Sequence, residues 1–170
     1  MARHKKDITD AQCGWLPRSR SCFVCGRDNP RGMQVRSRIE NGIVVLHYTP
    51  SDTDLGWKAI VHGGITMTLL DEVMTWSAIV ALRRACVAAE ITCRLLQPVR
   101  AGVPLRVEGE VVRAGGRLVL TEGRVLSPEG RQLAAGSGKY LPMAENAFRL
   151  CAEDFTEDED AIPLDRILGS

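Results

Sequence analysis

The sequence has almost no net charge. Its 170 residues include 22 Lys and Arg against 21 Asp and Glu, which gives a formal net charge of +1. A protein that attracts nucleic acid or an anionic membrane through its overall field needs a clear excess of positive charge. We therefore expect neither nucleic acid nor a membrane as a partner.

Long uncharged apolar runs are also missing. No stretch of the length of a membrane span is free of charge, and the first residues, MARHKKDITD, lack the apolar run of a secretory signal. We expect a cytoplasmic protein. In that compartment the six cysteines are reduced thiols rather than a disulfide framework.

The chain shows no internal repeat, and its length suits one domain with a real core. Charge is unevenly placed, because Lys and Arg are frequent in the first forty residues whereas residues 153–160 read EDFTEDED. We expect a flexible segment at 1–20, one domain at 21–143 and a loosely attached acidic tail at 144–170.

Apolar residues alternate in one part of the sequence and recur at helical spacing in the next. Residues 34–48, QVRSRIENGIVVLHY, alternate around Asn41-Gly42, a pair typical of a tight β-hairpin. From residue 63 to 83, apolar residues recur at helical spacing over more than one face. This spacing predicts a helix that is buried on most sides. Two acids at its middle make a membrane span unfavourable, by roughly 2 to 3.5 kcal/mol each.

After this helix come four alternating segments, at 88–99, 103–113, 117–126 and 131–141. Short links rich in Gly and Pro separate them, and such links join antiparallel neighbours. An antiparallel sheet and a single apolar helix must bury one another. We predict an α+β fold in which a curled antiparallel sheet wraps around one long central helix.

The acids in the helix are Asp71 and Glu72. A buried carboxylate needs a hydrogen bond, a counter-charge or a cavity. Asp71 shares its side of the helix with small and hydroxylated residues such as Thr75, so this side is a candidate pocket wall. The alternative for Asp71 is a structural ion pair with an arginine. Glu72 lies on the side of Trp76, where we expect a rim position or a salt bridge.

His62-Gly63-Gly64 comes directly before the helix. Backbone N–H groups at a helix start have no partner within the helix, and glycines let a ligand approach the main chain. A carboxylate that activates water or attacks directly, together with N–H groups that hold an oxyanion, suits acyl hydrolysis. We expect His62 to shape this site, or to cap the helix through its ring.

Gly63 and Asp71 are eight residues apart. At 1.5 Å per residue this is roughly 12 Å along the helix, too far for one carbonyl group to contact both. Two such helices, antiparallel about a two-fold axis, would bring Gly63 of one protomer near Asp71 of its partner. The chemistry therefore predicts a homodimer with paired sites at its interface.

The segments GWKAIV, HGGITMTLLDEVM and AAEITCRLLQPVRAGVPLRVEGEVV together resemble hotdog-fold thioesterases of the phenylacetate-pathway (PaaI-like) group, within the 4-hydroxybenzoyl-coenzyme A thioesterase superfamily. CFVCGRDNPRGM likewise resembles the N-terminal segment of many members. The resemblance spans about residues 21 to 142. It implies a hotdog fold and hydrolysis of acyl-coenzyme A (acyl-CoA) thioesters by dimers or dimers of dimers, with no cofactor beyond the CoA of the substrate.

The resemblance also implies roles for single residues. Asp71 corresponds to the catalytic carboxylate, and the Gly63 N–H to the donor that polarises the thioester carbonyl. His62 is the motif histidine, and Thr75 matches a hydroxyl that orients the carboxylate or water. The candidate substrate-binding residues are Val61, Gly64, Trp57, which could cover the acyl group, and Arg100, which could meet the CoA phosphates.

Two positions depart from the family pattern. Gly56 stands where many members have Asn or Gln, and Ala88 stands where Ser or Thr often begins the next strand. Because two polar helpers are missing, a noncatalytic acyl-CoA binding or sensing module is the alternative to a thioesterase.

Cys22 and Cys25 form the only recognisable cysteine pair. A structural zinc site needs four ligands, and only Cys13, Cys151 or His4 remain to complete it. No βαβ pattern of a thioredoxin surrounds the pair. We predict no metal site, and a metal- or redox-linked partner-binding protein is a third alternative.

Overall fold

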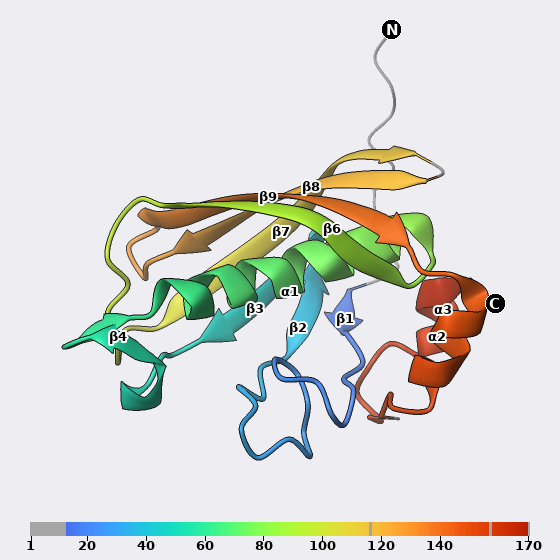
Figure 1. Cartoon of the computed structure of the whole chain (residues 1–170), viewed down its shortest axis with the longest axis horizontal. Helices are drawn as coiled ribbons and strands as arrows, with labels where there is room; N and C mark the ends of the chain where they lie inside the picture. Colours follow the sequence, from blue (N-terminus) through green and yellow to red (C-terminus); the bar gives the residue numbers. More distant parts are fainter. Residues whose placement is uncertain (1–12, 116, 157, 170) are drawn as a thin grey trace, which may run out of the picture.

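The computed structural model describes residues 13–115, 117–156 and 158–169. An antiparallel sheet curls around one long helix, α1 (Gly63–Leu82), as Figure 1 shows. The α+β fold with a central helix, predicted from apolar spacing, is confirmed. His4 and the other residues of 1–12 lie outside the described residues.

The main sheet has seven strands in the order β1-β2-β3-β7-β8-β9-β6. Every pair of neighbours is antiparallel. A short ribbon of two further strands follows the 3-10 turn η2 (Asp52–Asp54) and leads into α1. The main strands are β1 (Gly14–Trp15), β2 (Ser37–Glu40), β3 (Ile43–Tyr48), β6 (Cys86–Leu95), β7 (Leu105–Gly115), β8 (Leu118–Leu126) and β9 (Gln132–Pro142), and the ribbon strands are β4 (Leu55–Trp57) and β5 (Ile60–Val61).

The hairpin of β2 and β3 turns at Asn41 and Gly42. Their φ angles of 48° and 78° lie in the left-handed region, which Asn and Gly adopt at low cost. Ser37 then pairs with Leu46 and Glu40 with Ile43, so the alternating apolar residues of both strands face α1. The predicted hairpin is confirmed.

Three glycines let α1 lie close to the sheet. Gly109, Gly123 and Gly136 are cross-strand neighbours on β7, β8 and β9. A Cβ at Gly109 would lie 2.6 Å from the Val73 carbonyl oxygen of α1, and Cβ atoms at the other two would press on α1 side chains. The three glycines therefore form a groove in the sheet, and α1 packs into it. This close packing fixes the distance between the site residues of α1 and the strands.

Helix α1 is apolar because it is enclosed. By length and composition alone it could cross a membrane. Its residues Leu69, Leu70 and Val73 are nevertheless fully buried against the sheet. The helix ends at Arg83, whose φ of 56° is a left-handed C-cap.

The acidic C-terminal segment is packed against the domain, so the loosely attached tail expected from its composition is wrong for the described residues. It forms α2 (Glu145–Ala152) and α3 (Leu164–Leu168), which close one end of the sheet (Figure 1). Ile167 of α3 is 2% exposed and belongs to the core. Phe155 packs edge-on against Trp76 of α1. A few apolar anchors thus hold a segment whose average composition is polar.

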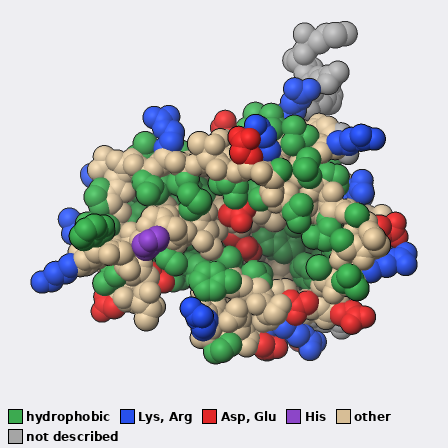
Figure 2. Space-filling model, viewed as in Figure 1, with side chains coloured by type: hydrophobic (Ala, Val, Ile, Leu, Met, Phe, Trp, Pro, Cys, Tyr) green, Lys and Arg blue, Asp and Glu red, His purple; other side chains and the backbone are tan. Residues whose placement is uncertain are grey.

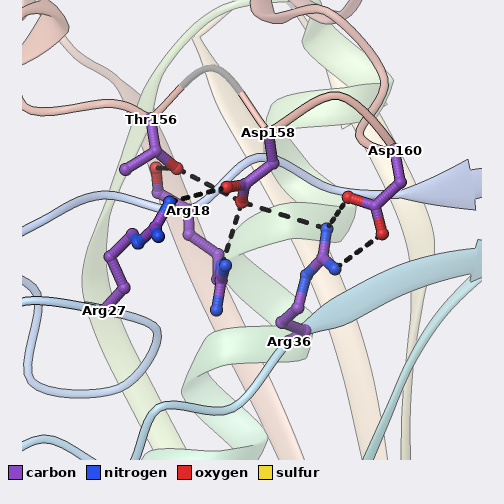
Figure 3. A network of polar contacts seen from close by, with 6 residues as sticks. All are labelled: Arg18, Arg27, Arg36, Thr156, Asp158 and Asp160. Carbon is purple, nitrogen blue, oxygen red and sulfur yellow. Dashed lines mark hydrogen bonds and ion pairs between the residues drawn. The ribbon is translucent and has the colours of Figure 1, made fainter.

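Charge holds the same segment to the N-terminal part of the chain (Figure 3). Arg18 donates to Asp158 at 3.0 Å, and Arg27 does so at 3.2 Å. Arg36 makes a two-pronged pair with Asp160, both bonds being 2.9 Å. The Arg18 hydrogen bond holds the pKa of Asp158 below its usual value. The expected flexible segment at 1–20 is likewise packed where it is described, since Leu16 is 1% exposed.

Candidate active site at the central helix

The start of α1 is built by His62 and Gly63. His62 is the N-cap, and its ring Nδ1 accepts a hydrogen bond of 2.9 Å from the Gly64 N–H. The capping role expected as one possibility for His62 is confirmed, and it requires an unprotonated Nδ1. Within the described chain the Gly63 N–H has no hydrogen-bond acceptor. This N–H therefore stays available to an outside acceptor at the positive end of the helix dipole.

Two glycines at the start of α1 lie close to neighbouring residues. A Cβ at Gly63 would lie 2.7 Å from Cδ1 of Leu95 on β6. Gly56, one of the two departures from the family pattern, packs against His62, and a Cβ there would come within 3.0 Å of the His62 Cα. The candidate substrate-binding residues Val61, Trp57 and Arg100 gather near this end of α1.

These three residues differ in exposure. Trp57 on β4 is 80% exposed, and Val61 on β5 is buried, with its N–H donating to the Val99 carbonyl. Arg100 is exposed and forms a β-bridge with Ile60. The arrangement leaves Trp57 and Arg100 free to contact a ligand, whereas Val61 contributes by positioning the backbone.

Asp71 lies in the middle of α1 and is held by hydroxyl groups. Its Oδ1 accepts a hydrogen bond of 2.8 Å from the Tyr140 hydroxyl and one of 3.1 Å from Thr75. Within the described residues Asp71 forms no ion pair, so the alternative of a structural pair with an arginine is wrong there. Its Oδ2 makes no hydrogen bond in this part of the chain. The carboxylate is fixed through one oxygen and leaves the other for chemistry.

Tyr140 was missed by the sequence reasoning. It lies on β9 and is fully buried. Its ring lies over Gly138, where a Cβ would approach Cε2 to 2.4 Å. Burial and the negative charge of Asp71 raise the pKa of Tyr140, so its hydroxyl stays protonated and donates at neutral pH. A usable signal was present, because alternation along β9 places Tyr140 on the inner face after Gly136 and Gly138.

The second departure from the family pattern lies beside this tyrosine. Ala88 on β6 is the cross-strand partner of Tyr140 on β9. Directly opposed residues of an antiparallel pair share a face of the sheet. The family pattern has a hydroxyl residue at the position of Ala88, and this chain does not. Tyr140, directly across from Ala88, supplies a different hydroxyl.

Glu72 follows Asp71 on α1, about 100° further around the helix. Its Oε1 accepts a hydrogen bond of 3.0 Å from the Trp76 indole N–H. Its carboxylate also lies with the sulfur atoms of Cys22 and Cys25, all three ligand atoms being within 4.8 Å of one another. Neither the rim nor the salt bridge expected for Glu72 is found in the described chain. The segment that carries these cysteines covers it instead.

On its exposed side, α1 is bordered by apolar groups. Figure 2 shows acidic side chains at the centre of a face that is otherwise rich in apolar side chains. A hollow of about 360 Å³ exists elsewhere, on the outer face of the sheet, where Arg94, Arg124 and Glu122 line it. Asp71 belongs to the inner face, so this hollow is separate from the candidate site.

The two parts of the candidate site remain apart in one protomer. The Gly63 N–H is at the first turn of α1, whereas Asp71 is eight residues further along the same straight helix. The chain alone therefore presents an oxyanion donor and an oriented carboxylate at two separate places.

Comparison with known protein families gives a match. The family model described as Thioesterase superfamily matches residues 58–134, which include the His62 motif, Asp71 and strands β6 to β8. Comparison with curated proteins gives no match. Residues 58–134 thus carry the sequence pattern of the thioesterase superfamily on a hotdog fold.

Solved structures share the fold. A thioesterase superfamily protein is 25% identical with a TM-score of 0.64, over 72% of this chain and 63% of that chain, so this chain spans less than two thirds of its length. The Escherichia coli PaaI protein of the phenylacetic acid degradation operon is 24% identical with a TM-score of 0.58, over 65% of this chain and 78% of that one. A Bacillus halodurans protein solved with CoA is 27% identical with a TM-score of 0.61, over 66% and 76%. The chain has the hotdog fold, and its residues 58–134 are similar to the thioesterase superfamily, as its motifs indicate.

Proposed function

We propose that this protein is an acyl-CoA thioesterase that releases a free acid and CoA. The observation that carries the proposal is the environment of the Asp71 carboxylate. Two hydroxyl groups donate hydrogen bonds to one of its oxygens, and in the described residues no arginine pairs with it. Such a carboxylate has its second oxygen available for activating water or for direct attack on the thioester carbonyl. The CoA bound in the Bacillus halodurans neighbour supports the same class of ligand.

The oxyanion donor comes from the partner protomer in this proposal. Strand β6 pairs with β9 on one side and is at the end of the sheet order. It is ten residues long, and Val87 and Leu95 on it are 44% and 58% exposed. A long, apolar, unpaired edge favours pairing with a second copy of the same strand.

Such pairing would assemble the site. On β6, Leu95 lies over Gly63, and Ala88 is opposite Tyr140, the donor to Asp71. Two β6 strands that pair antiparallel about a two-fold axis place the Leu95 end of one beside the Ala88 end of the other. Gly63 of one protomer then approaches Asp71 of its partner. The product is a homodimer with two equivalent sites, and dimers of dimers use the same pair.

In the proposed reaction the thioester carbonyl oxygen accepts a hydrogen bond from the partner's Gly63 N–H, which stabilises the negative charge that develops there. Asp71 takes a proton from a water molecule as this water attacks the carbonyl carbon, and the proton then passes to the departing CoA sulfur. In the alternative route Asp71 attacks the carbonyl carbon itself, CoA leaves as a thiolate that takes a proton from water, and a second water hydrolyses the acyl–Asp71 anhydride to the free acid. Thr75 and Tyr140 orient the carboxylate, and His62 fixes the helix start. Trp57 and Arg100 are placed to contact the acyl group and the CoA phosphates.

The test is a panel of acyl-CoA compounds with detection of both products. Free acid is measured by chromatography and CoA by a thiol reagent, with the signal of the protein's own cysteines subtracted. Asp71→Asn keeps a carbonyl oxygen that can accept from Tyr140 and Thr75, so the fold is preserved while the charge is removed. We expect hydrolysis of at least one compound, and loss of most of it in Asp71→Asn. Equal turnover by this variant would refute the role of Asp71.

A noncatalytic acyl-CoA binding module is the second candidate, favoured by Gly56 and Ala88 in place of polar side chains. The same panel separates the two functions. Saturable binding measured by calorimetry, without release of acid from any compound, would favour the binding module. Light scattering of the eluting protein measures the oligomeric state in the same experiment.

A further inference from the structure

A second cluster of reactive side chains includes Glu72, the residue after Asp71 on α1. Cys22 and Cys25 come from the loop before β2, and Glu72 comes from the middle of α1. One ligand atom from each lies within 4.8 Å of the others. Cys25 is buried, and Cys22 and Glu72 are partly buried. The fold thus brings two thiols and a carboxylate together across a sequence separation of about fifty residues.

The loop presents its sulfur atoms in a defined turn. The Cys22 sulfur accepts backbone N–H bonds from Val24 at 3.2 Å and from Cys25 at 3.4 Å. The Gly26 N–H closes the turn on the Cys22 carbonyl at 3.0 Å. A Cβ at Gly26 would lie 2.1 Å from this carbonyl oxygen, so the turn requires glycine. N–H bonds to sulfur stabilise the thiolate, which is the form that binds metal ions.

No basic side chain accompanies this cluster. In the described part of the chain, no Lys or Arg forms an ion pair with Glu72. The cluster therefore contains two sulfur atoms and a carboxylate without a cationic side chain paired to the carboxylate.

We propose that Cys22, Cys25 and Glu72 form a zinc site that fastens the N-terminal loop to α1. Zinc binds thiolate at about 2.3 Å and carboxylate oxygen at about 2.0 to 2.2 Å, so its tetrahedral ligands are separated by roughly 3.5 to 4 Å. The three ligand atoms reach this separation with small side-chain adjustments. Two thiolates select zinc over magnesium and calcium, which prefer oxygen ligands. A water molecule takes the fourth position, so the proposed site is of the open kind with three protein ligands and differs from the closed four-ligand site considered from the sequence.

The zinc site explains why Glu72 tolerates its position. A divalent cation would take the carboxylate and the two sulfur atoms as ligands, and the Trp76 N–H orients the carboxylate from the outside. It also joins residues 22–26 directly to the turn of α1 that carries Asp71. The remaining cysteines of the zinc hypothesis are elsewhere, because Cys13 and Cys151 are exposed and outside this cluster. This inference is independent of acyl-CoA hydrolysis.

The test uses the full chain without a histidine tag, purified under reducing conditions. Elemental analysis should find one zinc ion per chain. After removal of metal with a chelator, titration with Co²⁺ should give thiolate-to-cobalt absorption in the near ultraviolet and the strong visible bands of a tetrahedral site. Zinc should displace the cobalt stoichiometrically. These measurements use the wild-type protein, so they do not depend on a variant that folds.

Variants identify the ligands. Cys22→Ser and Cys25→Ser should lose the thiolate absorption, and Cys151→Ser, which changes a cysteine outside the cluster, should retain it. Glu72→Gln can still accept from Trp76 and should weaken zinc affinity at least 10-fold, with circular dichroism unchanged. Wild-type protein that takes up neither ion when its thiols are reduced would overturn the proposal. Unchanged zinc affinity in Glu72→Gln would also overturn it. The same holds if Cys151→Ser loses the cobalt absorption while Cys22→Ser and Cys25→Ser retain it.

Discussion

Removing the Tyr140 hydroxyl is the most informative single change in the proposed active site. Tyr140→Phe keeps the ring in its place over Gly138 and deletes only the 2.8 Å hydrogen bond to Asp71. A hydrogen bond to a charged group contributes about 1.5 to 3 kcal/mol. If this bond orients the carboxylate in the transition state, its loss lowers kcat/KM by about 10- to 100-fold. The Thr75 bond is longer and less buried, so Thr75→Val should cost less.

The assay is the initial rate of CoA release, together with urea unfolding of each variant. Thr75→Ser retains a hydroxyl and serves as the matched control, with activity near wild type. We expect Tyr140→Phe to lose about 1 kcal/mol of stability, because Asp71 still has the Thr75 donor. A Tyr140→Phe protein with wild-type kcat/KM, measured where Asp71→Asn is inactive, would refute the orienting role of this tyrosine.

Two further predictions concern the fold. Gly109→Ala pushes a Cβ against the Val73 carbonyl, and overpacking of this kind costs about 1 to 3 kcal/mol in urea unfolding; Gly115→Ala, whose Cβ meets its nearest atom at 3.7 Å, should be near neutral. Asp158→Asn removes the charge from a partly buried ion pair, so we expect a loss of about 1.5 to 3 kcal/mol at pH 7. The pKa of Asp158 is lowered in the folded state, so its contribution is complete above the unfolded value of about 3.9 and is lost as the pH falls through the folded value. The acid-induced loss of stability should therefore be smaller in Asp158→Asn than in wild type or in Asp28→Asn, and equal acid profiles in all three would contradict this.

The elements predicted correctly are those that local spacing specifies. Asn41-Gly42 marks the hairpin turn, and helical spacing with a glycine start marks α1, because each pattern depends on neighbours in the sequence. The row of glycines beneath α1 was not found, since cross-strand register decides which glycines become neighbours. Residue spacing within one strand does not contain this information.

The C-terminal segment shows how average composition misleads. The acidic run suggested solvation, but Asp158 and Asp160 meet arginines more than a hundred residues away in the sequence. Ile167 anchors the segment in the core although the preceding run, residues 153–160, is acidic. One buried apolar residue and one charge network outweigh the mean hydropathy of the segment.

Sequence reasoning about the candidate site was limited to contacts that are local in the sequence. Asp71, Gly63, His62 and Thr75 lie within one motif of α1, so their relative positions follow from helix geometry. Tyr140 reaches Asp71 from β9, and Cys22 reaches Glu72 from the N-terminal loop. These contacts are tertiary, and the fold had to be known before they could be seen.

Subunit complementation tests the central claim, that one site uses Asp71 of one protomer and Gly63 of its partner. Gly63→Pro removes the N–H at the first helical position, where proline is favoured, and His62 already has the extended ψ of 133° that suits a following proline. Gly63→Ala, which keeps the N–H, is the control. Asp71→Asn and Gly63→Pro chains should each be inactive.

When the two chains are unfolded, mixed in equal amounts and refolded together, half of the dimers are mixed, and each mixed dimer has one intact site. We expect about one quarter of the wild-type rate. A mixture that stays as inactive as its parents, while wild type mixed with Asp71→Asn keeps about half of its activity, would contradict a site shared between protomers.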